Sequence, residues 1–517
     1  MGTDNGKQTG DGDDKEHRAP EGASTESTWT APDGTQLPYV ATGEWMLLRE
    51  KDKPVAEMFS VSYVSLEQDV DPADRPVTFV FNGGPGASSA YLHVGALGPD
   101  RVAFAPEGRA LPPPTRLVNN DESWLAFTDL VFVDPIGTGF SRLVDPSATG
   151  ASAGGGNEKP VAMGEPDEKQ EKRFFALKRD LESIGEFIRR WLSSNDRWGS
   201  PVLIAGESYG GYRVARLARL LPETYGVGLS GAVVISPALE FSLLDPSDYD
   251  VLPWIDRLPT MAVTAAFHGR GRALPEGSPT SDVRAAAEEF ATGDYARFLA
   301  RGAAMPPRER EEVLQRLADL TGLPVEQVVR AEGRIDFTRF ARELLRDRAE
   351  VVGIYDATVT AHDPFPDREP MEWPDPTLAG IERVFASGVN QQVRSKIGVR
   401  TDREYILLSL EVNTSWQHDQ KKSWAENQIG ATDDLRYALS LSPHLQLFLT
   451  HGVYDLITPY FSSDRLSNLM RLRPDDGERF TVRHFDGGHM FYTWEESRKA
   501  FCAAMSDFYA VAAPRPD

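Results

Sequence analysis

The chain has 517 residues, of which 40% are hydrophobic and 26% charged, so it can bury a large core and is longer than one compact domain usually is. Its formal net charge of −23, without a long run of lysine or arginine, argues against nucleic acid or an anionic membrane as a partner. Cys502 is the only cysteine, which excludes an internal disulfide and a thiolate metal site. The histidines also lack ligand spacing, so we expect neither a metal nor another cofactor.

Residues 1–28 are predicted to form a disordered acidic tail. They lack the basic start and the apolar run of a signal peptide, and the chain holds no stretch of about 18 apolar residues that could span a bilayer. A cytoplasmic location without a transmembrane segment is therefore expected. A secreted or periplasmic chain whose leader had been removed would look the same.

Residues 29–240 are predicted to form the first part of an α/β core. Short β-branched and aromatic runs indicate strands, and apolar residues at helical spacing indicate helices. The strand-like segments are 43–50, 58–65, 76–81, 125–133, 201–207 and 231–239, and the helical segments are 171–194 and 211–221. Small residues at 147–168 predict a loop. Strands that alternate with helices in this order predict a mostly parallel, doubly wound sheet with helices on both faces.

Residues 241–431 are predicted to be an inserted helical lid, because the strong signals from 281–302 to 382–398 are helical with charged faces. Residues 432–517 are predicted to complete the α/β core. They begin with a helical segment and continue with two strand-like segments, 444–450 and 478–485. A closing helix is expected over 494–513.

Ser208 is the predicted nucleophile. It lies in a G-x-S-x-G pattern between a strand and an amphipathic helix, where a sharp turn lifts a serine hydroxyl above the sheet. The pattern alone is weak, and the chain holds a second match around Ser152. Ser152 falls in the small-residue loop, so the context favours Ser208. A serine that merely occupies a strand–helix turn is the plain alternative.

A nucleophilic serine needs a base and an acid on later strands of the sheet. His489 is the predicted base, because it follows a strand and a Gly-Gly turn, while His484 lies within the strand and His451 stands only four residues before the candidate acid. That acid is Asp455, just past a strand end. Asp486 remains a rival, and a turn-capping role for Asp455 is the alternative.

The oxyanion formed during attack on a carbonyl needs two hydrogen-bond donors. One should be the backbone N–H of the residue after the nucleophile, Tyr209, and the other an N–H of a glycine loop after an early strand. Gly84 in "FNGGPGASS" is the candidate. These glycines could also serve only to end a strand.

Four segments together resemble the serine carboxypeptidase family, in the manner of a bacterial-type member without disulfides. They are "NGGPGASS", "GESYGGYR", "HGVYDLITP" and "GGHMFY", at residues 82–89, 206–213, 451–459 and 487–492. The resemblance implies an α/β-hydrolase fold with the triad and oxyanion donors named above. It also implies that Asn82 and Glu207 bind the terminal carboxylate of a peptide and that Met490 lies near the leaving residue.

Glu207 could donate a hydrogen bond to that carboxylate only when protonated, which predicts peptide hydrolysis at acid pH. Any acidic residue at a helix N-terminus is stabilised by the dipole, which is the plain alternative. The chain departs from the family at Ala87, Val80 and Ala96, where the family has a cysteine, a tryptophan and a second glutamate.

The predicted function is a serine-type carboxypeptidase that releases the C-terminal residue of peptide substrates through an acyl-enzyme on Ser208. The first alternative is an esterase or acyltransferase with the same triad. The second is a catalytically silent binding protein on this scaffold. The sequence leaves the side-chain preference and the oligomeric state open.

Overall fold

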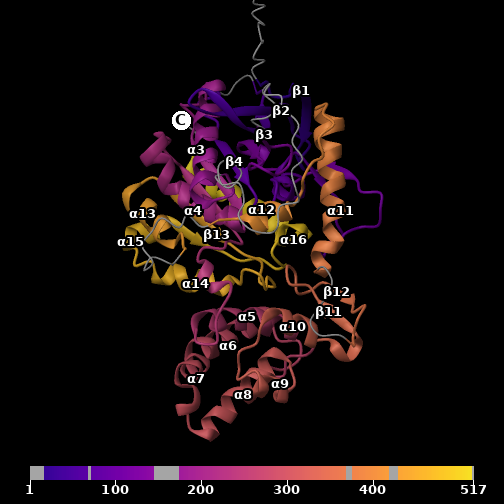
Figure 1. The fold of residues 1–517 in the computed structure, drawn as a ribbon, viewed down its shortest axis with the longest axis vertical. Helices are drawn as coiled ribbons and strands as arrows, with labels where there is room; N and C mark the ends of the chain where they lie inside the picture. The colour runs from indigo at the N-terminus through magenta and orange to yellow at the C-terminus, as the bar shows by residue number, and fades with distance from the viewer. Residues whose placement is uncertain (1–16, 68–70, 145–173, 368–374, 418–428, 515–517) are drawn as a thin grey trace, which may run out of the picture.

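The computed structural model describes residues 17–67, 71–144, 174–367, 375–417 and 429–514. A large mixed sheet occupies one part of the molecule, and a lobe of helices lies beyond one end of it (Figure 1). The small-residue loop predicted at 147–168, with the second motif serine Ser152, lies outside the described residues.

The main sheet has the strand order β1-β2-β3-β7-β4-β9-β10-β13-β14 within the described residues, with β8 paired to β3. The pairings from β7 to β14 are parallel, and those among β1, β2, β3 and β7 are antiparallel. The strands are β1 (Ala23–Thr30), β2 (Gln36–Glu50), β3 (Lys53–Ser65), β4 (Val77–Phe81), β7 (Asp129–Val133), β8 (Arg142–Leu143), β9 (Val202–Glu207), β10 (Gly231–Ile235), β13 (Gln446–Thr450) and β14 (Phe480–Val482). Because parallel strands end at the same edge, the loops after β4, β9, β10, β13 and β14 meet there.

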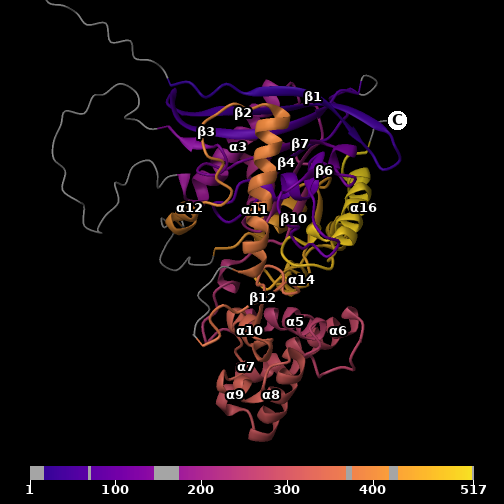
Figure 2. The same cartoon turned by 90° about the vertical axis from the view of Figure 1, so that its right-hand side faces the viewer.

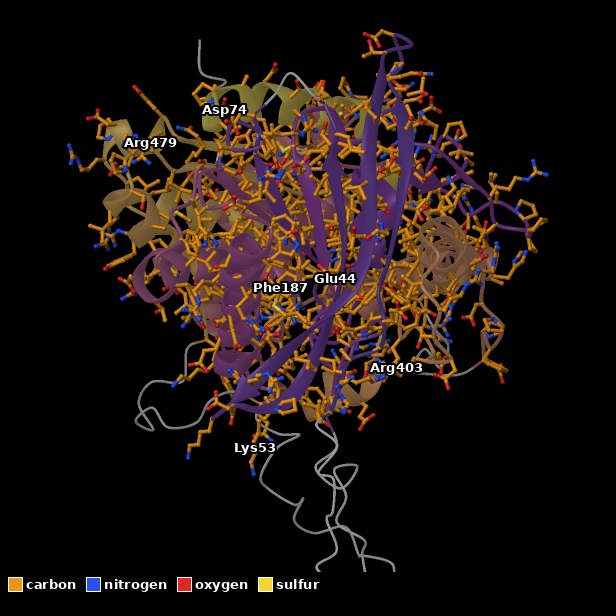
Figure 3. The ribbon with its side chains drawn as sticks, turned by 90° about the horizontal axis from the view of Figure 1, so that it is seen from above. Glu44, Lys53, Asp74, Phe187, Arg403 and Arg479 are labelled. Atoms are coloured by element: carbon orange, nitrogen blue, oxygen red, sulfur yellow. The ribbon has the colours of Figure 1, made fainter. Side chains whose placement is uncertain are left out.

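Helices cover both faces of this sheet. Successive side chains of a strand point to opposite faces, and in β4 Phe79 and Phe81 enter one apolar core while Val80 enters the other. The first face packs against α3 (Leu177–Ser194), α4 (Tyr209–Leu220) and α13 (Thr432–Leu441). The second packs against α1 (Ala90–Leu92), α11 (Pro376–Asn390) and α16 (Glu495–Ala512). Figure 3 looks onto the antiparallel end, with Glu44 of β2 and Phe187 of α3 labelled. The architecture is that of an α/β-hydrolase.

The helical lobe packs around a third apolar core, to which Val453, Tyr454 and Leu456 of the loop after β13 also contribute. It consists of α5 (Leu252–Phe267), α6 (Thr280–Phe290), α7 (Ala296–Arg301), α8 (Pro307–Thr321), α9 (Val325–Arg330), α10 (Phe337–Glu343) and the hairpin of β11 (Glu350–Val352) and β12 (Thr360–His362). A partly buried bidentate ion pair links the lobe to the main part, because Arg465 of α14 (Tyr460–Leu469) donates to both carboxylate oxygens of Asp256 at 2.8 and 2.7 Å.

The remaining short elements connect these parts. They are β5 (Asp100–Val102), β6 (Leu117–Asn119), α12 (Leu410–Ser415) and α15 (Pro474–Gly477). In the part of the chain described, no helix combines the length and the apolar character needed to cross a bilayer.

The structure differs from the sequence-based division in two places. Residues 23–28, expected in a disordered tail, belong to β1, which pairs with β2 along its whole length. Helix α11, expected inside the lid, runs along the flank of the sheet in Figures 1 and 2, and its Ile381, Val384 and Phe385 are buried in the core of the second face. The expected insertion of residues 241–431 therefore divides into a separate lobe and a segment that packs on the sheet.

Candidate active site

Ser208 occupies the sharp turn that joins β9 to α4. Its backbone has φ 62° and ψ −123°, a conformation that a non-glycine residue rarely adopts. The flanking glycines allow the turn, because a Cβ on Gly206 would lie 2.3 Å from the Gly210 carbonyl oxygen and one on Gly210 would lie 2.5 Å from that of Phe81. The hydroxyl is thus held at the carboxyl edge of the sheet, as a nucleophile elbow requires.

Asp455 and His489 form a hydrogen-bonded pair at the same edge. The Asp455 Oδ2 atom lies 2.7 Å from His489 Nδ1, and both side chains are buried. The other carboxylate oxygen accepts from the backbone N–H groups of Ile457 and Thr458 at 2.9 and 3.0 Å. The loop after β13 therefore fixes the orientation of the carboxylate independently of its contact with the imidazole. The rival acid, Asp486, has an exposed side chain.

Thr458 is a member of this cluster that the sequence reasoning missed. Its hydroxyl lies 2.7 Å from Asp455 Oδ2 and 3.1 Å from His489 Nδ1, and it donates to the Ser236 carbonyl oxygen at 3.0 Å. The hydroxyl thus links the carboxylate and the imidazole to Ser236, the residue that follows β10. A threonine three residues after the acid is the only signal the sequence offers.

The negative charges around His489 favour its protonated form. Burial opposes protonation, but the negative charge of Asp455, its hydrogen bond and the charge of Glu207 outweigh burial and raise the pKa of His489. The ring of Tyr355, from the β11–β12 hairpin of the lobe, meets the imidazole edge to face with centroids 5.4 Å apart. The imidazole is therefore oriented by the core on one side and by the lobe on the other.

The serine and the imidazole share the end of β10 as a common support. The Ser208 N–H donates to the Ile235 carbonyl at 2.9 Å, and the Ser236 hydroxyl donates to the His489 carbonyl at 2.8 Å. Among the described residues, no hydrogen bond joins the Ser208 hydroxyl to His489. Such bonds are often long in ligand-free enzymes and tighten when substrate binds.

The glycine loop after β4 lies directly against the elbow. A Cβ on Gly83 would lie 2.4 Å from the Tyr209 nitrogen and 2.7 Å from the Glu207 carbonyl oxygen, so only glycine allows this approach. Gly84 follows with φ 98°, in the left-handed region that glycine favours. Tyr209 is the first residue of α4, where backbone N–H groups have no partner within the helix. The predicted oxyanion residues Gly84 and Tyr209 are thus on adjoining segments.

Asn82, Glu207 and Tyr492 form a second polar cluster beside the serine. Glu207 Oε2 accepts from the Asn82 side-chain amide and from the Tyr492 hydroxyl, the latter at 3.0 Å. Burial raises the pKa of Glu207 to about 7, against the opposing effects of His489, Tyr492 and Asn82. The structure brings the predicted pair Asn82 and Glu207 together and adds Tyr492, which the sequence reasoning missed.

Met490 follows the histidine and is almost fully buried. It lines a cavity of about 210 Å³ between the lobe hairpin, the start of α11 and the loop at residues 108–110. Asp356, Arg109 and Arg383 are the charged residues of its lining. Met490, which the resemblance put near the leaving residue, therefore borders a hollow whose lining includes none of Ser208, Asp455 and His489.

The other histidines of the C-terminal part have separate partners. His451 lies 2.8 Å from the Ser463 hydroxyl, and burial lowers its pKa well below the ordinary value. His484 Nε2 lies 2.7 Å from Asp464. Over the ranges that the structure describes, no three His, Cys, Asp or Glu side chains gather as a metal-binding group would.

Comparison with known proteins gives a family match in the N-terminal part. The family model for serine carboxypeptidases matches residues 47–238, which include Asn82, Glu207 and Ser208 but neither Asp455 nor His489. "Serine carboxypeptidase-like 45" and "Serine carboxypeptidase-like 13" of Arabidopsis thaliana are 29% and 25% identical to this chain, each over 35% of it. The chain spans about a third of the length of these relatives, 33% and 36% respectively.

Solved structures with a similar course of the chain include a proline iminopeptidase of Mycobacterium smegmatis. It has 13% identity and a TM-score of 0.35, and the alignment covers 91% of this chain and 99% of that one. A carboxyl esterase of Bacillus coagulans has 11% identity and a TM-score of 0.33, with 95% and 99% covered.

Proposed function

We propose that this chain, which belongs to the serine carboxypeptidase family, hydrolyses the C-terminal peptide bond of peptides through an acyl-enzyme on Ser208. Ser208 Oγ attacks the scissile carbonyl while His489 accepts its proton. The imidazolium then donates that proton to the leaving amine, and the C–N bond breaks. Water, deprotonated by the same imidazole, attacks the ester and restores the serine. Asp455 keeps Nδ1 protonated and stabilises the imidazolium.

The negative oxygen of each tetrahedral intermediate would be bound by the backbone N–H groups of Gly84 and Tyr209. The close approach of Gly83 to the Tyr209 nitrogen supports this assignment, because it aligns the two segments that carry the donors. Donors held in place before the reaction need no reorganisation when charge develops, and each is worth about 3 to 4 kcal/mol in the transition state.

The observation that carries the choice of a carboxypeptidase is the buried carboxyl of Glu207, with the Asn82 amide on one oxygen and a pKa of about 7. Below that pKa Glu207 is neutral and can donate to the terminal carboxylate of a peptide. Above it, an ionised Glu207 would repel the same carboxylate at short range in a low-dielectric site. An esterase would gain nothing from this arrangement.

The sign of the pH dependence follows from the two groups. His489 acts as a base only when neutral, so every substrate loses turnover as the pH falls below the pKa of His489. Free-acid peptides also lose binding as the pH rises through about 7, where Glu207 ionises. Their profile should be bell-shaped, whereas esters and peptide amides should show only the rise with pH.

The test compares an N-blocked dipeptide with its C-terminal amide and its ester, from about pH 4 to 8, in wild-type enzyme and in Glu207→Gln. We expect the wild type to release free amino acid with a bell-shaped profile. Glutamine cannot ionise, so the variant should keep free-acid cleavage at the alkaline end. Identical profiles for free acid and amide in the wild type would refute the carboxylate role.

The same assay separates the alternatives. Ester cleavage without amino-acid release would point to an esterase or acyltransferase with this triad. A fluorophosphonate probe tests the silent-scaffold alternative, since it labels only an activated serine. We expect labelling of the wild type and none of Ser208→Ala; absence of labelling in both would refute a catalytic role.

A further inference from the structure

We propose that Tyr492 is a positioning residue that directs the proton of neutral Glu207 to one oxygen, Oε1, from which it is donated to the substrate carboxylate. The inference rests on the proposed function. It starts from an asymmetry: Oε2 of Glu207 has two donors, whereas Oε1 is buried and has no hydrogen-bond partner among the described residues.

The first donor, the Asn82 amide, has a fixed orientation. The backbone N–H of Leu92 donates to Asn82 Oδ1 at 3.0 Å, so the Nδ2 hydrogens must face Glu207. The backbone of Asn82 is also fixed, because Arg213 donates to its carbonyl oxygen at 2.6 Å and pairs with Asp180. Neither an amide flip nor a shift of the loop can therefore turn Oδ1 toward the carboxyl.

The second donor is the Tyr492 hydroxyl, 3.0 Å from Oε2. Tyr492 is fully buried, and Glu207 is the one hydrogen-bond partner that the described residues give its hydroxyl. If the Glu207 proton were on Oε2, the phenol would have to accept it and its own hydrogen would face no acceptor. An unpaired buried donor is costly, so Tyr492 donates and Oε2 stays unprotonated.

The proton of neutral Glu207 then belongs on Oε1. A buried hydroxyl without a partner is itself unfavourable, and an anionic acceptor in the site would relieve that cost. The carboxylate of a peptide C-terminus is such an acceptor. Binding thus converts one unsatisfied atom into a charge-assisted hydrogen bond.

The fold leaves room for the phenol at this point. Gly95 faces the ring, and a Cβ there would lie 3.1 Å from Tyr492 Cε2 and 2.8 Å from Phe385 Cε1. The ring also contacts Phe491, with centroids 5.9 Å apart. Tyr492 is therefore held by packing on both sides, and loss of its hydroxyl alone should leave the ring in place.

Several other groups act on the Glu207 carboxyl. They are His489 after β14, Asp455 after β13, Tyr91 on α1 and Tyr355 in the lobe hairpin. Tyr492 stabilises the ionised form more than the neutral one, since a hydrogen bond to a charge is the stronger. Its hydroxyl therefore lowers the pKa of Glu207 in opposition to burial.

The test is Tyr492→Phe, with Tyr509→Phe as the matched control. Tyr509 is a buried tyrosine on α16 whose hydroxyl bonds Thr78 in the core. In Tyr492→Phe the alkaline limb of free-acid peptide cleavage should move up by about one pH unit. At acid pH its KM for free acids should rise by no more than about twofold, because the proton is then shared by two oxygens. Tyr509→Phe should match the wild type.

A second substitution moves the limb in the opposite direction without removing the hydroxyl. With 3,5-difluorotyrosine at position 492 the phenol is a stronger donor, so the limb should move to lower pH. Labelling of Ser208 by a fluorophosphonate reports whether each variant is folded. The protonated-carboxyl infrared band that is absent in Glu207→Gln reports the same titration without substrate.

The outcomes separate this inference from the proposed function. If Glu207→Gln abolishes the alkaline limb but neither change at Tyr492 moves it, the positioning role is wrong and the carboxypeptidase assignment stands. A downward shift in Tyr492→Phe would also overturn the inference. If the wild type has no alkaline limb specific to free acids, the proposed function fails, and the infrared titration alone then decides whether Tyr492 sets the pKa of Glu207.

Discussion

Replacing Glu207 by glutamine should change how the stability of the folded chain depends on pH. The carboxyl is buried and has a pKa of about 7, compared with 4.5 for the ordinary side chain. The folded state therefore binds this proton more tightly than the unfolded state. The stabilisation is complete below about pH 4.5 and is lost as the pH rises through about 7.

The magnitude follows from the two pKa values. Their difference, 7 − 4.5 = 2.5, at 1.36 kcal/mol per pH unit corresponds to about 3 kcal/mol of unfolding free energy. Glutamine does not titrate, so Glu207→Gln escapes this loss. Relative to the wild type, the variant should gain about 3 kcal/mol between pH 4 and pH 8, whatever its stability at the acid end.

Urea unfolding of both proteins at a series of pH values measures the difference. Glu312→Gln, on the exposed face of α8, serves as the control for a change of charge at the surface. Its difference from the wild type should stay small throughout. A difference between Glu207→Gln and the wild type that does not change with pH would show that the carboxyl is not held neutral by burial, and the proposed substrate binding would lose its basis.

Three further substitutions test other parts of the site. Asp455→Asn should lower kcat by about 10³ to 10⁴ with little change in KM, because the imidazole loses its oriented tautomer; stopped assays of ester cleavage measure this. Gly83→Ala should lower kcat about 100-fold without unfolding the chain, because its methyl group would displace the loop from the Tyr209 nitrogen; unchanged kcat would contradict the oxyanion assignment. Arg213→Met should destabilise the chain by about 3 to 5 kcal/mol, because it leaves the Asp180 carboxylate buried and unpaired, and thermal unfolding with and without Asp180→Leu tests this.

The sequence predicted the acid, base and nucleophile candidates because each stands just past a strand, at a turn with a recognisable pattern. The structure places Asp455 against His489 as that reasoning expected, and it puts Ser208 at the elbow. Their catalytic roles remain predictions. The order of residues along the chain carried this information, since parallel strands bring their ends together whatever packs around them.

Partners that depend on packing could not be predicted in the same way. Tyr492 reaches Glu207 because Gly95 faces its ring, and neither residue has a periodic pattern that would reveal the contact. Helix α11 has the same amphipathic pattern whether it packs in a lid or on a sheet, so its sequence did not identify its neighbour. Strand β1 is mostly exposed, with Trp29 as its buried residue, and therefore lacks the alternation that marks a strand.

The way in which the lobe meets the main part has a consequence for dissecting the chain. Val453, Tyr454 and Leu456, on both sides of the Asp455 carboxylate, belong to the apolar core of the lobe. The N–H of Leu456 donates to the Ile354 carbonyl at 3.1 Å, which ties the acid's loop to the lobe hairpin. The lobe thus supports the loop that carries Asp455. We expect a truncated protein without residues 245–365 to lose the position of the Asp455 carboxylate together with the apolar residues that pack against this loop. A shortened version of this fold would have to keep the lobe, or replace the apolar residues that pack against the loop carrying Asp455.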